Sequence, residues 1–168
     1  GNYEINKNKK KLNIINEKVF VKIISPNFDL KYGLTEKQIE ERLKKLIRYS
    51  NPTKEKITLF IWPEGVFSGY SYEEISVFNE LITKNFSKNH TIIFGINRLD
   101  LKSGKFYNSM LAVDNNFKII QEYNKRKLVP FGEFLPFEKF LNNFGLKKIT
   151  EGHGSFLKGN ENNNLSIY

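Results

Sequence analysis

The chain has 168 residues, of which 39% are hydrophobic and 15 are phenylalanine; this composition excludes a disordered protein and predicts one folded domain. The absence of cysteine excludes disulfides, cysteine-ligated zinc and a cysteine nucleophile within these residues. A formal net charge of +9 suggests anionic partners such as nucleic acid or lipid headgroups, although AT-rich codons, which favour Lys and Asn, also explain it.

The N-terminal residues 1–18 are polar and rich in Lys and Asn, and we interpret them as a linker before a folded region over 19–168. No apolar run approaches the ~20 residues that a membrane-spanning helix needs, and no signal peptide is visible. The chain starts at Gly1 rather than Met and stops at Tyr168 within an apolar stretch. We therefore expect it to be a piece of a longer protein.

The folded region reads as an alternation of strands and helices. Apolar, β-branched runs predict buried strands at 19–24, 57–62 and 91–97. Between them, Thr35 with Gln38 and Ser71 with Glu74 have the spacing of capping boxes, so each pair predicts the start of a helix.

Two further apolar runs, 106–114 and 117–123, are expected to pair as a hairpin across Asn115 and Asn116. The order is therefore strand, helix, strand, helix and three more strands. It predicts an α/β sheet in which some of the strands are parallel.

Glu64, in the sequence WPEG, follows a predicted strand and a proline directly. Ligands of α/β sheets bind beyond the carboxyl ends of strands, which is where this side chain lies. A carboxylate held there and partly shielded from water can act as a general base. A surface glutamate in a turn, or one that caps a nearby helix, explains the same sequence.

The second unusual segment is YNKRKLVPFGEFLP, residues 123–136, which also follows a predicted strand. Its two prolines and its apolar residues restrict the loop, so at least one of its three consecutive basic residues can point inward. A lysine fixed beside Glu133 suits the stabilisation of a developing oxyanion. A surface basic cluster paired with Glu133 is the alternative interpretation.

Together, Glu64 in WPEG and Lys125 in the second segment resemble the nitrilase (carbon–nitrogen hydrolase) superfamily. The motif K…LVPFGE resembles a motif of apolipoprotein N-acyltransferases in particular. The resemblance extends over 19–168, is strongest from Thr58 to Pro136, and implies the N-terminal portion of a catalytic domain. The implied fold class is α/β, a nitrilase-like α-β-β-α sandwich that is incomplete in this chain.

The resemblance also implies roles for individual residues. Glu64 matches the general base, Lys125 the lysine that stabilises the oxyanion, and Glu133 a glutamate that holds this lysine. Asn108, in the sequence YNS, matches an element near the substrate. The implied reaction needs no metal and no cofactor, and we expect neither.

The implied reaction moves an acyl chain from a phospholipid, through a cysteine thioester, to the N-terminal amine of an apolipoprotein. The chain has neither that cysteine nor the family's membrane helices, so we expect a fragment that is inactive alone. The expected location is the bacterial inner membrane, reached through segments outside these residues, with the catalytic domain facing the periplasm. No nucleic-acid partner is expected.

Phenylalanines recur every three or four residues after the second segment, at Phe131, Phe134, Phe137, Phe140 and Phe144. One interpretation is the core-facing stripe of a helix that starts after Pro136. The other is an aromatic face that admits acyl chains, with Phe131 and Phe134 binding substrate.

Two other functions remain open. A soluble amidase of the nitrilase family would act on a small polar substrate and need no phenylalanine face. A non-catalytic basic module that binds RNA would leave Glu64 and Lys125 far apart.

Overall fold

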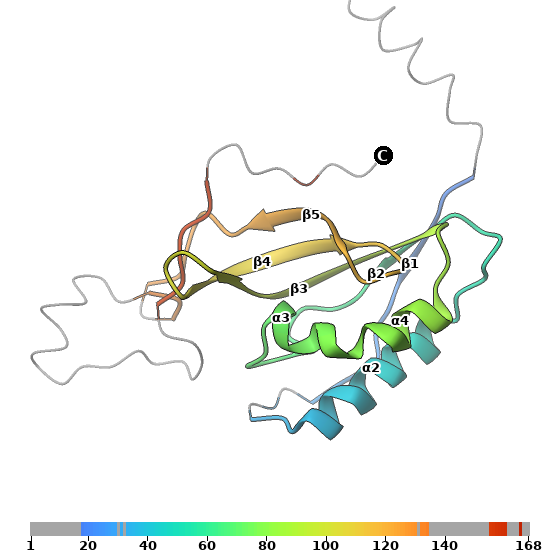
Figure 1. Ribbon diagram of the computed structural model, residues 1–168, viewed down its shortest axis with the longest axis horizontal. Coiled ribbons are helices and arrows are strands. Elements are labelled where there is room, and N and C mark those ends of the chain that lie inside the picture. The colour runs from blue at the N-terminus through green and yellow to red at the C-terminus, as the bar shows by residue number, and fades with distance from the viewer. Residues whose placement is uncertain are drawn as a thin grey trace, which may run out of the picture.

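The computed structural model describes residues 18–29, 31, 33–130, 132–134, 155–160 and 165. The described part is a five-stranded sheet with helices on one of its faces (Figure 1). The strands are β1 (Phe20–Ile23), β2 (Thr58–Ile61), β3 (His90–Asp100), β4 (Lys105–Val113) and β5 (Ile119–Asn124). The helices are α2 (Glu36–Ser50), α3 (Tyr72–Ile75) and α4 (Asn79–Asn85), with a 3₁₀ turn at Ser76–Phe78. Residues 1–17 and 135–154, which include most of the expected linker and the expected helix after Pro136, lie outside the described residues.

The sheet has the order β1-β2-β3-β4-β5 and changes its pairing at β3. Strands β1, β2 and β3 are parallel, whereas β4 is antiparallel to both β3 and β5. This confirms the expected parallel pairing and the β4–β5 hairpin. The strand direction reverses from β3 to β4 and again from β4 to β5, so β5 runs the same way as β2. The carboxyl ends of β2 and β5 therefore lie at the same edge of the sheet.

Both predicted capping boxes are present. The Thr35 hydroxyl accepts a hydrogen bond from the Gln38 backbone N–H at 3.3 Å, and the Thr35 N–H donates to the Gln38 side chain at 3.0 Å. The Ser71 N–H likewise donates to the Glu74 carboxylate at 2.7 Å. These bonds satisfy N–H groups that have no partner within the helix.

The helix expected to run on from Ser71 is divided into α3, the 3₁₀ turn and α4. The Ser76 hydroxyl donates to the Glu73 carbonyl at 2.7 Å, a local bond of the kind that bends helices. Both helical pieces contribute to the core, because Ile75 and Ile82 are buried. The prediction was therefore right about the start of the helix and wrong about a continuous helix.

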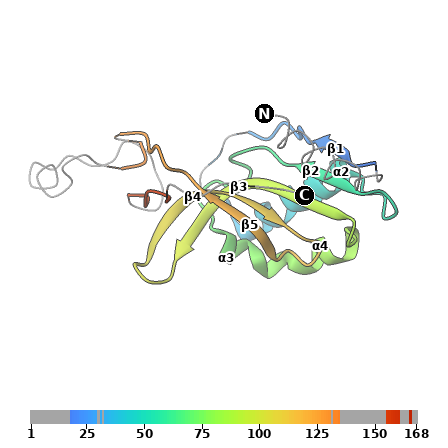
Figure 2. The same ribbon diagram turned by 90° about the horizontal axis from the view of Figure 1, so that it is seen from above.

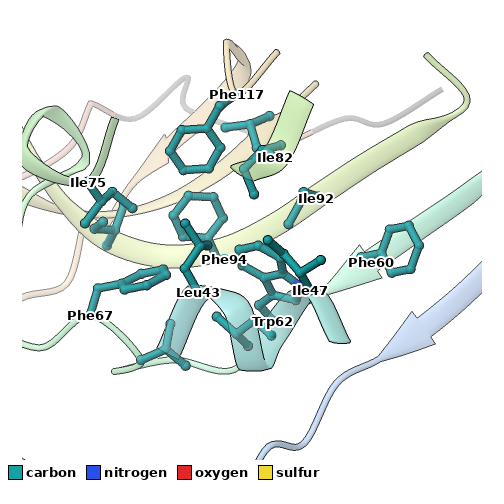
Figure 3. Close-up of a cluster of buried hydrophobic side chains, with 14 of the residues drawn as sticks. Leu43, Ile47, Phe60, Trp62, Phe67, Ile75, Ile82, Ile92, Phe94 and Phe117 are labelled. Carbon is teal, nitrogen blue, oxygen red and sulfur yellow. The ribbon is translucent and has the colours of Figure 1, made fainter. Parts of the chain in front are cut away.

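The main core lies between the helices and the sheet, with Phe94 of β3 at its centre (Figure 3). The Phe94 ring stacks on Phe117 with their centroids 5.8 Å apart and lies 5.8 Å from Trp62. The Trp62 indole N–H donates to the buried Ser50 hydroxyl at 3.0 Å, so the polar atoms of this pair are satisfied inside the core.

The other face of the sheet carries no helix within the described residues, as the view from above shows (Figure 2). Side chains alternate between the faces, so the partners Ile23, Ile61, Ile93 and Ala112 form one apolar row on this open face. Ile23 is 77% exposed at the edge strand. The described residues thus supply one helical layer and one sheet, the α-β half of the expected α-β-β-α sandwich.

None of the helices in the described ranges is both long enough and apolar enough to cross a lipid bilayer.

Candidate active site

Glu64 and Lys125 leave the sheet at the same edge. Glu64 comes three residues after the last residue of β2, and Lys125 follows β5 directly. Since β2 and β5 run in the same direction, the topology places these two loops at the same edge of the sheet, with β3 and β4 between their strands, although some sixty residues separate them in the chain.

The backbone before Glu64 is an extension of β2. The Trp62 N–H donates to the Ile93 carbonyl at 2.8 Å, which continues the pairing with β3 beyond the strand's last residue. The Glu64 Cγ atom lies 3.6 Å from the point where a Cβ atom would stand on Gly95. Gly95 alternates with Phe94 and Ile96, which face the core, so the Glu64 side chain lies over the open face.

Glu64 also borders a small cavity of about 200 Å³ between the loops that follow β1 and β2. Its side chain is exposed, which differs from the partial shielding that we expected of a general base. The physical reason is that no described element covers the open face above Gly95.

Lys125, Glu133 and Asn108 form one hydrogen-bonded cluster. The Lys125 ammonium lies 2.8 Å from Oε1 of Glu133, and the Asn108 amide donates to the same oxygen at 2.7 Å. The second oxygen, Oε2, accepts from the backbone N–H of Val129 at 2.7 Å. The carboxylate is therefore held at both oxygens.

Burial raises the pKa of Glu133, but the hydrogen bonds from Lys125, Val129 and Asn108, together with the charge of Lys125, outweigh it and lower the pKa below its ordinary value. Glu133 thus stays ionised as the counter-ion of Lys125. The Glu133 side chain is only 14% exposed, against 37% for Lys125, so the lysine is the more accessible partner.

The cluster shares the open face with Glu64. Asn108 pairs with Asn97, two residues beyond Gly95, and the Lys125 N–H donates to the Asn108 carbonyl at 2.8 Å. Paired residues lie on the same face, so Asn108 and Lys125 face the side on which Glu64 lies. Two strand spacings, about 10 Å, separate the β3 and β5 backbones, and Glu64 and Lys125 line two different cavities.

A cavity of about 1260 Å³ opens beside Lys125. Four basic residues line it, namely Lys125, Arg126, Lys127 and Lys158, and so do three aromatic residues, Tyr123, Phe134 and Phe156. This lining suits a ligand with an anionic group next to an apolar part. Phe134 is thus placed at the cavity, whereas Phe131 lies outside the described residues.

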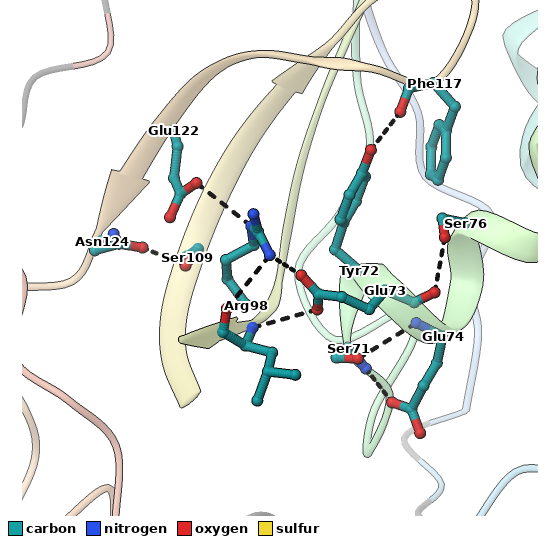
Figure 4. Close-up of polar contacts among 11 residues, drawn as sticks. Ser71, Tyr72, Glu73, Glu74, Ser76, Arg98, Ser109, Phe117, Glu122 and Asn124 are labelled. Carbon is teal, nitrogen blue, oxygen red and sulfur yellow. Dashed lines mark hydrogen bonds and ion pairs between the residues drawn. The ribbon is translucent and has the colours of Figure 1, made fainter. Parts of the chain in front are cut away.

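Sequence reasoning missed a charged cluster on the helix-facing side of the same edge (Figure 4). Arg98 forms ion pairs with Glu73 and Glu122, and its guanidinium lies 5.6 Å from the centre of the Tyr72 ring. Arg98 follows Phe94 and Ile96 at the core-facing positions of β3. The sequence did offer a signal: Arg98 is a charged residue at a position where the alternation along β3 predicts a core-facing apolar side chain. A charge at such a position needs an oppositely charged partner.

Arg42 of α2 was also missed, and it joins the two loops around Glu64. Its guanidinium donates to the Val66 carbonyl at 3.0 Å and to the Asp29 carbonyl at 2.7 Å, and it lies 4.8 Å from the centre of the Phe28 ring. No local pattern reveals these contacts, because the partners are 13 and 24 residues away in the chain.

Comparisons with known proteins identify the family. The chain is 33% identical over 116 residues to the apolipoprotein N-acyltransferase of Rhodopseudomonas palustris, covering 66% of this chain and 22% of that protein. It is 31% identical over 155 residues to the enzyme of that name from Vibrio vulnificus, covering 80% and 30%. The chain thus spans between a fifth and a third of the length of these relatives.

Among solved structures, a carbon-nitrogen hydrolase from Helicobacter pylori G27 matches 66% of this chain and 40% of its own, with 17% identity and a TM-score of 0.47. The family model for carbon-nitrogen hydrolases matches residues 29–156, which include Glu64, Asn108, Lys125 and Glu133. The chain therefore belongs to the carbon-nitrogen hydrolase family.

Proposed function

We propose that this chain is part of the catalytic domain of an apolipoprotein N-acyltransferase, in which Glu64 is the general base and Lys125 stabilises the oxyanion. The observation that carries the proposal is the common placement of Glu64 and of the Lys125–Glu133 pair on one face and at one edge of the sheet. The similarity to enzymes of that name supports it.

The proposed reaction has two steps. A cysteine thiolate attacks the ester carbonyl of a phospholipid, the bond to the glycerol oxygen breaks, and a lysophospholipid leaves with a proton. The free amine of a lipid-modified cysteine on the apolipoprotein then attacks the thioester, and the carbon–sulfur bond breaks as the amide forms. The thiol must come from residues outside this chain, which contains no cysteine and on this account is inactive alone.

Each step needs a proton acceptor and a positive charge. Glu64 accepts the proton of the thiol in the first step and that of the amine in the second. The Lys125 ammonium faces the carbonyl oxygen as negative charge develops on it, and Glu133 keeps the ammonium in place. Asn108 fixes Glu133 from the other side, and Phe134, with Phe131, is proposed to contact the acyl chain.

The partners and location follow from the same proposal. The mixed basic and aromatic lining beside Lys125 favours a phospholipid over the small polar substrate of a soluble amidase. If the chain were an RNA-binding module, Glu64 and Lys125 would not be expected to share one face of the sheet. Their placement on one face therefore favours an enzyme. We propose that the domain works at the periplasmic side of the bacterial inner membrane.

The test replaces each proposed group in the complete protein and measures acyl transfer from phospholipid to a lipid-modified peptide. Glu64→Gln and Lys125→Met are each expected to lower kcat by about 10²-fold or more. The exposed residues Glu55 and Lys118 provide matched controls, so Glu55→Gln and Lys118→Met should retain the wild-type rate. Wild-type rates in Glu64→Gln or Lys125→Met would exclude the proposed roles, and hydrolysis of small amides without acyl transfer would favour the amidase.

A further inference from the structure

Residues 155–160 lie against the backbone of the Lys125–Glu133 pair. The Gly159 N–H donates to the Lys125 carbonyl at 3.0 Å, and the Phe156 N–H donates to the Glu133 carbonyl at 2.8 Å. Between these two bonds, the Leu157 N–H donates to the Phe106 carbonyl of β4 at 2.8 Å. Three hydrogen bonds from one short segment therefore fix both partners of the ion pair to the sheet.

The backbone of Lys125 is held from two sides. Its N–H donates to the Asn108 carbonyl on β4, and its carbonyl accepts from Gly159 on the other side. The Lys125 main chain thus lies between β4 and the segment 155–160, as the middle strand of a sheet would. Such a residue has little freedom to translate along or out of the sheet.

Gly159 reaches this position only because it has no side chain. A Cβ atom added there would lie 2.1 Å from the Asn124 carbonyl oxygen and 2.7 Å from the Asn124 carbonyl carbon. Both are backbone atoms next to Lys125, so no side-chain rotation relieves the overlap. Any larger residue at 159 forces the two backbones apart.

We propose that residues 155–160 act as a clasp that sets the position of the Lys125 ammonium, and that Gly159 is the positioning residue of this clasp. The inference rests on the proposed function, in which Lys125 faces the developing oxyanion. Gly159 contacts neither substrate nor reacting atoms in this proposal and acts only through the Lys125 backbone.

The test is Gly159→Ala in the complete protein. The overlap requires a displacement of about 1 Å, and a misplacement of this size costs about 10²-fold in rate. We expect kcat for acyl transfer to fall about 10²-fold, while the KM for phospholipid changes less than about threefold. Asn160→Ala is the matched control, because Asn160 is exposed and adjacent, and it should behave as wild type.

A second readout separates positioning from general damage and does not depend on acyl transfer. When the Lys125 ammonium moves away from Glu133, the pKa of Glu133 should rise toward its ordinary value. A ¹³C titration of the Glu133 carboxyl in the full chain measures this change. Phe156→Pro, which removes the N–H donor to the Glu133 carbonyl, tests the other end of the clasp if Gly159→Ala fails to fold.

A lower kcat together with a raised pKa of Glu133 supports the clasp. Unchanged kcat in Gly159→Ala overturns it, and so does a lower kcat with an unchanged pKa of Glu133. If Lys125→Met retains acyl transfer, the proposed function fails instead, and a raised pKa of Glu133 in Gly159→Ala still reports that residue 159 sets the ion pair.

Discussion

The Glu64 side chain packs directly over Gly95, with its Cγ atom 3.6 Å from the point where a Cβ atom of residue 95 would stand. This distance is an ordinary van der Waals contact, so a methyl group fits there. The two extra methyl groups of valine extend beyond that point and into the space of the Glu64 side chain.

The first prediction is therefore a contrast between two substitutions at one position. Gly95→Val should displace the Glu64 carboxylate and lower kcat for acyl transfer by about 10²-fold, as a misplacement of about 1 Å does. Gly95→Ala should keep kcat within about threefold of wild type. Steady-state kinetics on both variants check this, and equal rates for the two would show that the contact does not position Glu64.

The second prediction concerns Glu133 and pH. Its pKa in the folded protein is below the ordinary value, so its contribution to stability is fully present above the unfolded-state pKa and is lost as the pH falls through the folded-state pKa. Glu133→Gln should therefore destabilise the protein more at pH 7 than at pH 3. Urea unfolding at the two pH values measures the difference.

The control for this pH effect is Glu55→Gln, since Glu55 is exposed. Its change in unfolding free energy should be small and similar at both pH values. A loss of stability in Glu133→Gln that is equal at pH 3 and pH 7 would contradict the role of the ionised carboxylate.

The third prediction concerns Arg42, which donates to the Val66 and Asp29 carbonyls. Arg42→Met should lower the free energy of unfolding by about 1.5–3 kcal/mol, the range for hydrogen bonds to charged groups. Arg42→Lys should not restore it, because one ammonium cannot reproduce the planar fork of a guanidinium. Chemical denaturation measures both, and full stability in Arg42→Lys would argue against a two-carbonyl bridge.

A matched control for Arg42 lies on the same helix. Arg48 is exposed and its guanidinium lies 5.6 Å from the centre of the Tyr49 ring, which is also exposed. Arg48→Met should change the free energy of unfolding by no more than about 0.5 kcal/mol.

The fourth prediction uses the chain's single tryptophan, Trp62. Ser50→Ala leaves the buried indole N–H without its acceptor and should cost about 1–3 kcal/mol of stability. Urea unfolding followed by Trp62 fluorescence measures the loss. Ser25→Ala, at an exposed loop position, is the control, and an equal effect in both variants would show that the buried bond contributes nothing specific.

Local patterns predicted those parts of the fold that depend on nearby residues. Both capping boxes and the β4–β5 hairpin depend on side chains within a few positions of each other, so the sequence displays them directly. The predicted end of the third strand at Asn97 was wrong, since β3 continues to Asp100. The prediction ended the strand before Arg98, because a charged side chain is not expected in a buried strand. Arg98 nevertheless remains in β3, because Glu73 and Glu122 neutralise its charge.

The candidate site was partly accessible to the same reasoning. Glu64 and Lys125 each come soon after a predicted strand, and this position indicated that they are candidate site residues. The contacts of Gly159 with Asn124 and Lys125 were not accessible, because a glycine in a loop has the same sequence signature whether it lies in solvent or against another backbone. Only the three-dimensional packing distinguishes these cases.

The strict alternation of sides along β4 has a consequence for how this sequence can vary. Asn108 faces the site because it stands two positions before Met110, whose partner Gly95 lies beneath Glu64. Inserting one residue between Asn108 and Met110 would turn the asparagine toward the helices and break its bond to Glu133. We therefore expect changes in chain length to be tolerated in the reverse turn at 101–104 but not between Asn108 and Met110.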